Sequence, residues 1–126
     1  MKSPPQISDA EWEVMSVIWD SAPISTNEVV ERLSLQKDWQ PSTIRTMLQR
    51  LVKKGVLANE QEGKQYFYRP TVSREKCVRL ESQSFLSRVF GGEATPLLVH
   101  FVKSAKLTPP DIQELKRTLT EKEKSS

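Results

Sequence analysis

The sequence of this 126-residue chain predicts a mainly α-helical protein with one small β-hairpin. Two capping boxes, which begin at Ser8 and Ser25, precede apolar residues at helical spacing and mark the starts of two helices. A third amphipathic stretch begins at Pro41, in a first-turn position, and ends at Gly55. After Gly55 the apolar residues alternate over a short run and then return to helical spacing, which predicts a hairpin followed by further helices.

The composition is that of a globular protein, with 37% apolar and 28% charged residues. No apolar run approaches the ~18–20 residues that a membrane span needs, and the N-terminus lacks the apolar stretch of a signal peptide. The single cysteine, Cys77, excludes an internal disulfide and favours a reducing compartment. We therefore expect a cytoplasmic protein with no membrane insertion.

Charge is distributed unevenly along the chain, although the net charge is only +3. Residues 1–31 carry one lysine and six acids, whereas residues 32–54 carry six basic residues and one acid. A positive region concentrated around one helix predicts a local electrostatic surface for an anionic partner.

The first two helices have apolar faces of the usual kind. Their apolar positions recur three and four residues apart, at Trp12, Met15, Ile18, Trp19, Val29, Val30 and Leu33. A turn over residues 34–40 then leads into the third helix, and Trp39 is expected to fill the gap between the second and third helices. This order of elements is a helix-turn-helix arrangement.

The third helix has one apolar and one polar, cationic face. Its apolar stripe consists of Ile44, Met47, Leu48, Leu51 and Val52. The opposite stripe and its flanks carry Ser42, Thr43, Arg45, Thr46, Gln49, Arg50 and Lys53, and no acid occurs in residues 39–59. Such groups read base edges and bind phosphates, although an ordinary solvated helix face is the alternative interpretation. Because Gln40 is a poor N-cap, Ser42 is an alternative cap that would shorten the helix by a turn.

The hairpin is predicted from two short runs, residues 57–61 and 65–69, that flank a turn containing Gly63. A hairpin that follows a recognition helix is a wing, and Lys64 at its tip and Arg69 are candidate phosphate contacts. The alternative is that the aromatic residues at positions 66–68 only pack the hairpin against the helices.

The remaining residues predict three amphipathic helices. The first is capped by Ser73 and ends at Gly91, the second begins near Thr95, and the third begins near Thr108. Because so short a segment buries little surface alone, we interpret it as a homodimer interface; folding back onto the first 70 residues is the alternative. The predicted domains are 1–71, a winged-helix DNA-binding domain, and 72–126, a three-helix dimerisation domain. The predicted interface residues are Phe85, Leu86, Val89, Leu97, Leu98, Phe101, Val102, Ile112, Leu115 and Leu119.

The sequence offers little catalytic chemistry. Lys76 and Arg79 are near enough in sequence to lower the pKa of Cys77, but a lone helical cysteine is typically inert. The single histidine, His100, lies in an apolar run, where a structural role is the default. Zinc-ligand spacing, a glycine-rich phosphate loop and a nucleophile with a base are all missing from the sequence. We therefore predict no enzyme activity, no metal and no cofactor.

Several motifs together resemble the BlaI/MecI family of penicillinase and methicillin-resistance repressors. They are SDAEWEVM at 8–15, KDW at 37–39, PSTIRT at 41–46, Arg50-Leu51 and Lys53-Lys54-Gly55, and the likeness runs from about residue 7 to 119. The resemblance implies a winged helix, a helical dimerisation domain and palindromic operator DNA with TACA/TGTA half-sites. It places the third helix in the major groove. The predicted DNA-binding residues are Ser42, Thr43, Arg45, Thr46, Gln49, Arg50, Lys53, Lys54 and Lys64.

The resemblance also implies a proteolytic switch. In this family a membrane-bound β-lactam sensor protease leads to cleavage before a phenylalanine of the dimerisation domain, directly or through an intermediary protease. The matching bond here joins His100 and Phe101, where the family usually has Asn-Phe. Better known members also have a lysine in place of Ser42. The copper-responsive relatives have a C-terminal cysteine cluster that this sequence lacks.

The resulting hypothesis is a homodimeric transcriptional repressor of the type that controls β-lactam resistance genes, relieved by cleavage in its dimerisation domain. The first alternative is a winged-helix protein-interaction module, because residues 1–70 carry nine basic and nine acidic residues. The second is a small-molecule-responsive regulator with a pocket between its domains.

Overall fold

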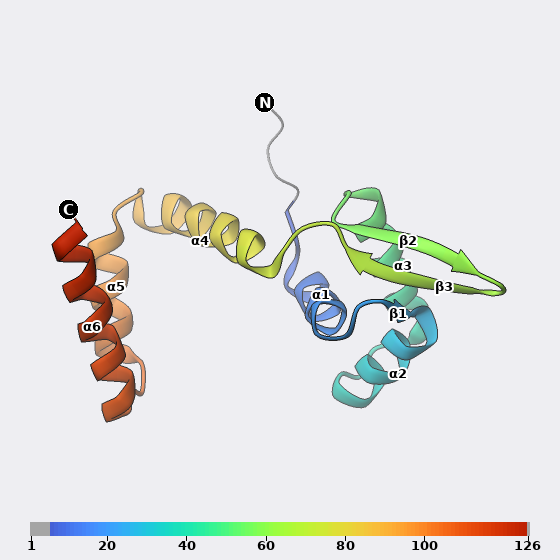
Figure 1. The fold of residues 1–126 in the computed structure, drawn as a ribbon, viewed down its shortest axis with the longest axis horizontal. Coiled ribbons are helices and arrows are strands. Elements are labelled where there is room, and N and C mark those ends of the chain that lie inside the picture. The colour runs from blue at the N-terminus through green and yellow to red at the C-terminus, as the bar shows by residue number, and fades with distance from the viewer. Residues whose placement is uncertain (1–5, 126) are drawn as a thin grey trace. The chain divides into compact units, whose positions relative to one another are not determined.

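The computed structural model describes residues 6–125 and contains the predicted helices and hairpin (Figure 1). This confirms the mainly α-helical fold class with a winged helix. In chain order the elements are α1 (Asp9–Ser21), β1 (Ile24–Ser25), α2 (Thr26–Gln36), α3 (Pro41–Lys53), β2 (Leu57–Glu62), β3 (Gln65–Pro70), α4 (Arg74–Phe90), α5 (Ala94–Ser104) and α6 (Pro109–Ser125).

The sheet has one strand that the sequence analysis did not predict. The short strand β1 pairs antiparallel with β3, so that the three strands lie in the order β1-β3-β2. Ile24 is opposite Tyr68 in this pairing, and Ser25 is opposite Phe67. The pairing joins the start of α2 to the hairpin, and the β2–β3 hairpin projects beyond the helices as a wing (Figure 1).

The chain divides into two compact units, one up to Ser82 and one from Gln83 onward. The helix α4 runs through the point of division. Cys77, in the first half of α4, is buried with the core of the first unit. The core of this unit therefore includes residues beyond position 71, and the division into domains 1–71 and 72–126 stays a prediction.

The core of the first unit is formed by α1, α2, α3 and the sheet. Its largest fully buried side chains are Met15, Ile18, Ile24, Leu33, Ile44, Leu48 and Leu51. Trp39 is half-buried and packs against this core, and its expected position between α2 and α3 stays a prediction. The apolar stripe of α3 therefore faces inward and fixes which side of the helix is exposed.

The second unit has a different character. Among its described residues none is buried, and the apolar side chains of α5 and α6 are mostly exposed. No helix of the described chain combines the length and the apolar character that a membrane span requires.

Candidate nucleic-acid interface

The ends of α3 are fixed by local backbone chemistry. Gln40 is its N-cap residue and Pro41 its first residue, so the alternative cap at Ser42 is wrong. At the other end Gly55 adopts a φ of +83°, a left-handed conformation that favours glycine. Gly55 N donates to Val52 O at 3.0 Å and Val56 N donates to Leu51 O at 3.1 Å, which is a Schellman motif. The helix therefore has its full predicted length.

The outward face of α3 brings together most of the predicted DNA-binding residues. All seven of the predicted residues within the helix are exposed, namely Ser42, Thr43, Arg45, Thr46, Gln49, Arg50 and Lys53. The Thr46 hydroxyl donates to Ser42 O at 2.9 Å, which leaves its oxygen free to accept. The helix carries three basic residues and no acid. This face therefore combines positive charge with side chains that donate and accept hydrogen bonds.

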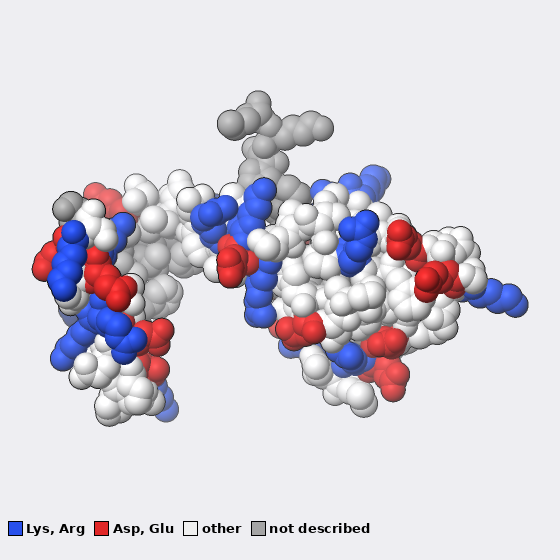
Figure 2. Space-filling view, in the orientation of Figure 1, with Lys and Arg blue, Asp and Glu red and all other residues white. Residues whose placement is uncertain are grey.

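The wing presents Lys64 at its tip. Gly63 has a φ of +61° in the turn between β2 and β3, and the exposed Lys64 follows it. Tyr68 is buried in the core, Phe67 is half-buried and Tyr66 is 45% exposed. Tyr68 therefore packs the hairpin against the core, whereas Tyr66 is exposed, so the alternative that all three aromatic residues only pack the hairpin is not confirmed. Acidic side chains lie on the wing near its basic tip (Figure 2). Glu60 and Glu62 of β2 are both exposed.

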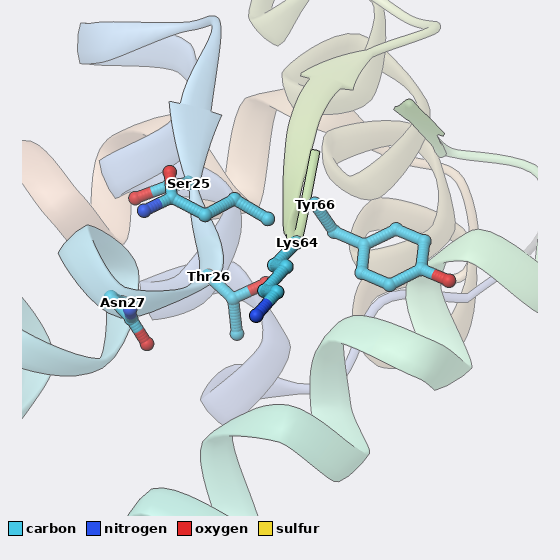
Figure 3. Close-up of a pocket in the computed structure, with 6 residues that line it drawn as sticks. Ser25, Thr26, Asn27, Lys64 and Tyr66 are labelled. Carbon is cyan, nitrogen blue, oxygen red and sulfur yellow. The ribbon is translucent and has the colours of Figure 1, made fainter. Parts of the chain in front are cut away.

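A pocket joins the wing to the start of α2 (Figure 3). It is lined by Ser25, the N-cap residue of α2, by Thr26 and Asn27 from the first turn of α2, and by Lys64, Gln65 and Tyr66 from the wing. The first turn of a helix presents free N–H groups and a partial positive charge, and the Lys64 side chain lies next to Thr26. Sequence reasoning missed Thr26 and Asn27. The cap at Ser25 was visible in the sequence, but the pairing of β1 with β3 was not.

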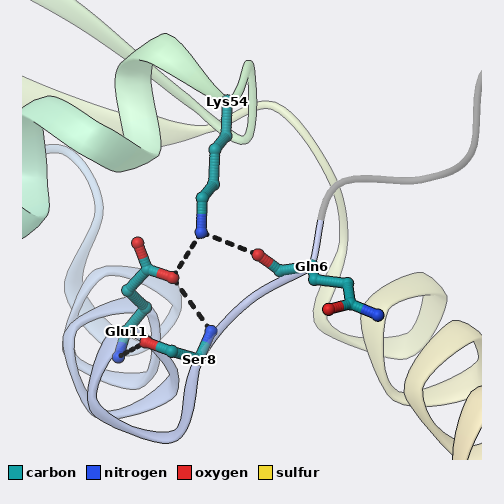
Figure 4. A network of polar contacts seen from close by, with 4 residues as sticks. All are labelled: Gln6, Ser8, Glu11 and Lys54. Carbon is teal, nitrogen blue, oxygen red and sulfur yellow. Dashed lines mark hydrogen bonds and ion pairs between the residues drawn. The ribbon is translucent and has the colours of Figure 1, made fainter.

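Lys54 differs from the other predicted DNA-binding residues because its side chain is bonded to residues far away in the sequence. Its ammonium donates to Glu11 Oε1 at 2.6 Å and to Gln6 O at 2.7 Å (Figure 4). Ser8 N also donates to Glu11 Oε1, at 2.9 Å, and the Ser8 hydroxyl accepts from Glu11 N at 3.2 Å. The capping box at the start of α1 is thus tied to the end of α3. A DNA contact by Lys54 stays a prediction, but its ammonium already has partners within the chain.

Glu11 is unusually buried for a carboxylate, with 3% of its surface exposed. Burial raises the pKa of its carboxyl, but hydrogen bonds from Lys54 and Ser8 lower it by more, so that the pKa lies below the ordinary value for glutamate. Its Oε2 atom is buried and has no hydrogen-bond partner among the described residues. Glu11 is therefore held ionised by Lys54, which makes the pair a structural link between α1 and α3.

The predicted interface residues of the second unit form an uncovered set of apolar side chains. Eight of the ten are exposed and two, Leu86 and Leu97, are half-buried. Leu98 is 54% exposed, Phe101 50% and Leu119 63%. His100 is also exposed, and its ring lies 5.8 Å from the ring of Phe101. The bond between these two residues, the predicted cleavage site, lies on α5.

The remaining candidate groups show no catalytic arrangement. Burial raises the pKa of the Cys77 thiol by more than the positive charge of Lys76 lowers it. Within residues 6–125 no three His, Cys, Asp or Glu side chains are grouped so as to hold a metal ion.

The helix α3 packs its apolar face into the core and exposes its basic face, and a β-hairpin follows it. This arrangement defines a winged-helix protein of the DNA-binding class. The family model described as "Penicillinase repressor" matches residues 7–121. The penicillinase repressor of Bacillus licheniformis is 43% identical over 121 residues, which cover 96% of this chain and 94% of that protein. The methicillin resistance regulatory protein MecI of Staphylococcus aureus strain N315 is 37% identical over 117 residues, 93% of this chain and 95% of that one.

Two solved structures agree with these relatives. The DNA-binding domain of the repressor BlaI is 53% identical, with a TM-score of 0.54, and the match covers 59% of this chain and 90% of that one. Monomeric Bacillus licheniformis BlaI in complex with the blaP half-operator is 52% identical, with a TM-score of 0.52, covering 60% and 92%. The chain therefore belongs to the penicillinase repressor family, which confirms the resemblance found in its sequence. This is a family of bacterial transcriptional repressors that bind DNA and regulate antibiotic resistance, and not of enzymes.

Proposed function

We propose that this chain is a homodimeric transcriptional repressor that binds palindromic operator DNA with TACA/TGTA half-sites. The observation that carries the proposal is the exposed face of α3, which is basic, free of acids and fixed by a buried apolar stripe. The BlaI structure with a half-operator supports it, because that domain shares 52% of its residues with the matched part of this chain.

In this proposal the residues of α3 divide into two groups. Arg45, Arg50 and Gln49 have the planar donors that pair with base edges in the major groove, the arginines with guanine and the glutamine with adenine. Ser42, Thr43 and Thr46 contribute hydroxyls to bases or phosphates. Ser42 is uncharged where better known members have lysine, so the chain makes one cationic contact fewer there.

Phosphate contacts come from Lys53 at the end of α3 and from Lys64 on the wing. Lys64 shares its pocket with the first turn of α2, where the helix dipole favours an anion, although Glu28 N already donates to the Ser25 hydroxyl and Glu28 adds a negative charge to that turn. Both lysines are exposed, so each is able to neutralise one phosphate. Glu60 and Glu62 limit the total attraction of the wing for DNA.

The exposed apolar side chains of α5 and α6 support dimerisation through the second unit. Two linked DNA-binding units bind a palindrome more tightly than one unit does. Binding of the first unit raises the effective concentration of the second unit at its half-site. Cleavage between His100 and Phe101 would cut α5 and remove this assistance while leaving α3 intact. We propose such cleavage as the relief mechanism, performed by a membrane-bound sensor protease or an intermediary protease. Phe101→Ala is expected to block induction in cells while the dimer still represses.

A gel-shift titration tests the DNA-binding part. Purified protein is titrated onto a TACA…TGTA palindrome and onto a scrambled duplex of the same composition, at two salt concentrations. Arg50→Ala is expected to cost about 1–3 kcal/mol on the palindrome and little on the scrambled duplex. The matched control is Arg79→Ala, which removes the same charge from α4. Equal binding of both duplexes would remove the operator assignment, and no binding at low salt would favour the protein-interaction alternative.

A further inference from the structure

The connection between the wing and α4 is held to the rest of the first unit by three hydrogen bonds. The Trp19 indole Nε1 donates to Val72 O at 3.0 Å. The Thr71 hydroxyl donates to Gly55 O at 2.5 Å, and Thr71 N donates to Val56 O at 3.0 Å. The partners are Trp19 of α1 and Gly55 and Val56, which closely follow α3, so the connection is fixed against α1 and against the segment after α3.

The first turn of α4 continues this attachment. The Ser73 hydroxyl accepts from Lys76 N at 3.1 Å, and Ser73 O accepts from Cys77 N at 3.2 Å. Cys77 is buried in the same core as α1 and α3, and Val72 packs against that core. Residues 71–77 are therefore an anchored segment, and α4 starts from a defined place on the first unit.

Trp19 is the residue that joins this anchored segment to α1. Its bond spans 53 positions of the sequence, and its ring packs against Trp12 with 5.4 Å between centroids. An indole N–H only donates, so a half-buried tryptophan typically places it on a carbonyl. The bond therefore fixes both the rotamer of Trp19 and the position of the Val72 carbonyl, one residue before the cap of α4.

We propose that Trp19 is a positioning residue that sets the half-site spacing accepted by the dimer. The inference rests on the proposed function. The helix α4 runs unbroken from Arg74 to Phe90 and carries the chain from the first unit into the second. Each added base pair moves one half-site by about 3.4 Å and rotates it by about 35° around the duplex. A dimer in which each first unit is held rigidly to its α4 tolerates few half-site spacings. A dimer in which this attachment is loosened tolerates several.

The test measures affinity against half-site spacing with the full chain. The probes are duplexes in which the distance between TACA and TGTA changes one base pair at a time, together with a duplex carrying one half-site. Wild-type protein is expected to lose about tenfold or more in affinity one or two base pairs from its optimum. Trp19→Phe, which keeps an aromatic ring but removes the donor, is expected to lose less than about threefold over the same change. Its affinity for the single half-site is expected to match that of the wild type.

Two further variants make the result decisive. Trp12→Phe alters the neighbouring ring without touching the bond to Val72, and it is expected to keep the wild-type spacing profile. Thr71→Val removes the hydroxyl bond to Gly55 and is expected to broaden the profile as Trp19→Phe does, so it decides the matter if Trp19→Phe does not fold. A profile as narrow as the wild type in both Trp19→Phe and Thr71→Val, or half-site affinity lost together with spacing selectivity, would overturn the proposal. Wild-type protein that binds the palindrome no better than one half-site would instead contradict the proposed function.

Discussion

The two units of this chain have similar amphipathic patterns but different surroundings. Leu48 of α3 is fully buried in the first unit, whereas Leu98 and Phe101 of α5 are about half exposed in the second. In the first unit α1, α2, α3 and the sheet cover one another, but in the second no described residue is buried. A pattern of apolar residues therefore identifies a helix face that is suited to burial, but it does not identify the partner that buries the face. Our proposal is that a second copy of the chain covers the second unit.

The largest expected effect comes from placing a charge on the uncovered face. Leu98→Asp is expected to prevent dimerisation, because the carboxylate would be desolvated at the interface. Affinity for a full palindrome is then expected to fall about 10²–10⁴-fold, while affinity for one half-site stays unchanged. Sedimentation gives the oligomeric state and a gel shift gives the affinities. Thr95→Asp, on the same helix, is the control. A dimeric Leu98→Asp protein would show that the exposed apolar face of α5 is not the dimer interface.

Two leucine truncations compare the units directly. Leu48→Ala creates a cavity in a closed core and is expected to reduce the free energy of unfolding by about 2–5 kcal/mol at any protein concentration. Leu119→Ala removes a side chain that is 63% exposed in the single chain, so its effect should depend on how much dimer is present. Denaturant unfolding at two protein concentrations separates the cases. Equal losses that are independent of concentration would contradict the proposed covering of the second unit.

The pH dependence of stability tests the link between Glu11 and Lys54. Because the folded-state pKa of Glu11 is lowered, its contribution is fully present above the unfolded value of about 4.3 and is lost as the pH falls through the lower folded value. Glu11→Gln is expected to cost about 1–3 kcal/mol at pH 7 and to weaken the loss of stability at acid pH. Thermal unfolding between pH 7 and pH 3 measures both effects.

The second unit supplies the matched control for this measurement. Asp111 N donates to the Thr108 hydroxyl and Thr108 N donates to the Asp111 carboxylate, so α6 also begins with a capping box. These hydrogen bonds lower the pKa of Asp111, but the group is fully exposed to solvent. Asp111→Asn is therefore expected to have a smaller effect than Glu11→Gln, and the reverse order would show that burial of Glu11 is unimportant.

The smallest effect concerns phosphate contacts. Lys53→Ala and Lys64→Ala are each expected to weaken binding to all duplexes about equally and to reduce the slope of log affinity against log salt by about one. Lys103→Ala, in the second unit, is expected to leave the slope unchanged. Duplex titrations over a salt series measure it. If Lys103→Ala lowered the slope as much as the other two variants, both units would contact DNA.

The sequence predicted features that depend on neighbouring residues. The capping box of α1, the start of α3 at Pro41 and its end at Gly55 each follow from chemistry within a few positions. The exposed face of α3 was predictable for the same reason, because helical spacing decides which side chains share a face.

Features that depend on distant residues were missed. The strand β1 has two residues, too few for a period, and exists because Ile24 and Ser25 pair with the distant β3. Lys54 follows Lys53 in sequence, yet its ammonium is bound to Glu11, 43 positions away. The burial of Cys77 and the bond from Trp19 to Val72 likewise require the assembled core.

We propose that two copies of the first unit, each presenting α3 to the DNA, are joined through the exposed apolar face of the second unit. The most direct test is to measure how many wild-type chains bind one palindrome, and how much more tightly they bind it than a single half-site. We expect two chains per palindrome and an affinity at least about 100-fold higher than for the half-site. One chain per duplex, with equal affinity for both, would contradict it.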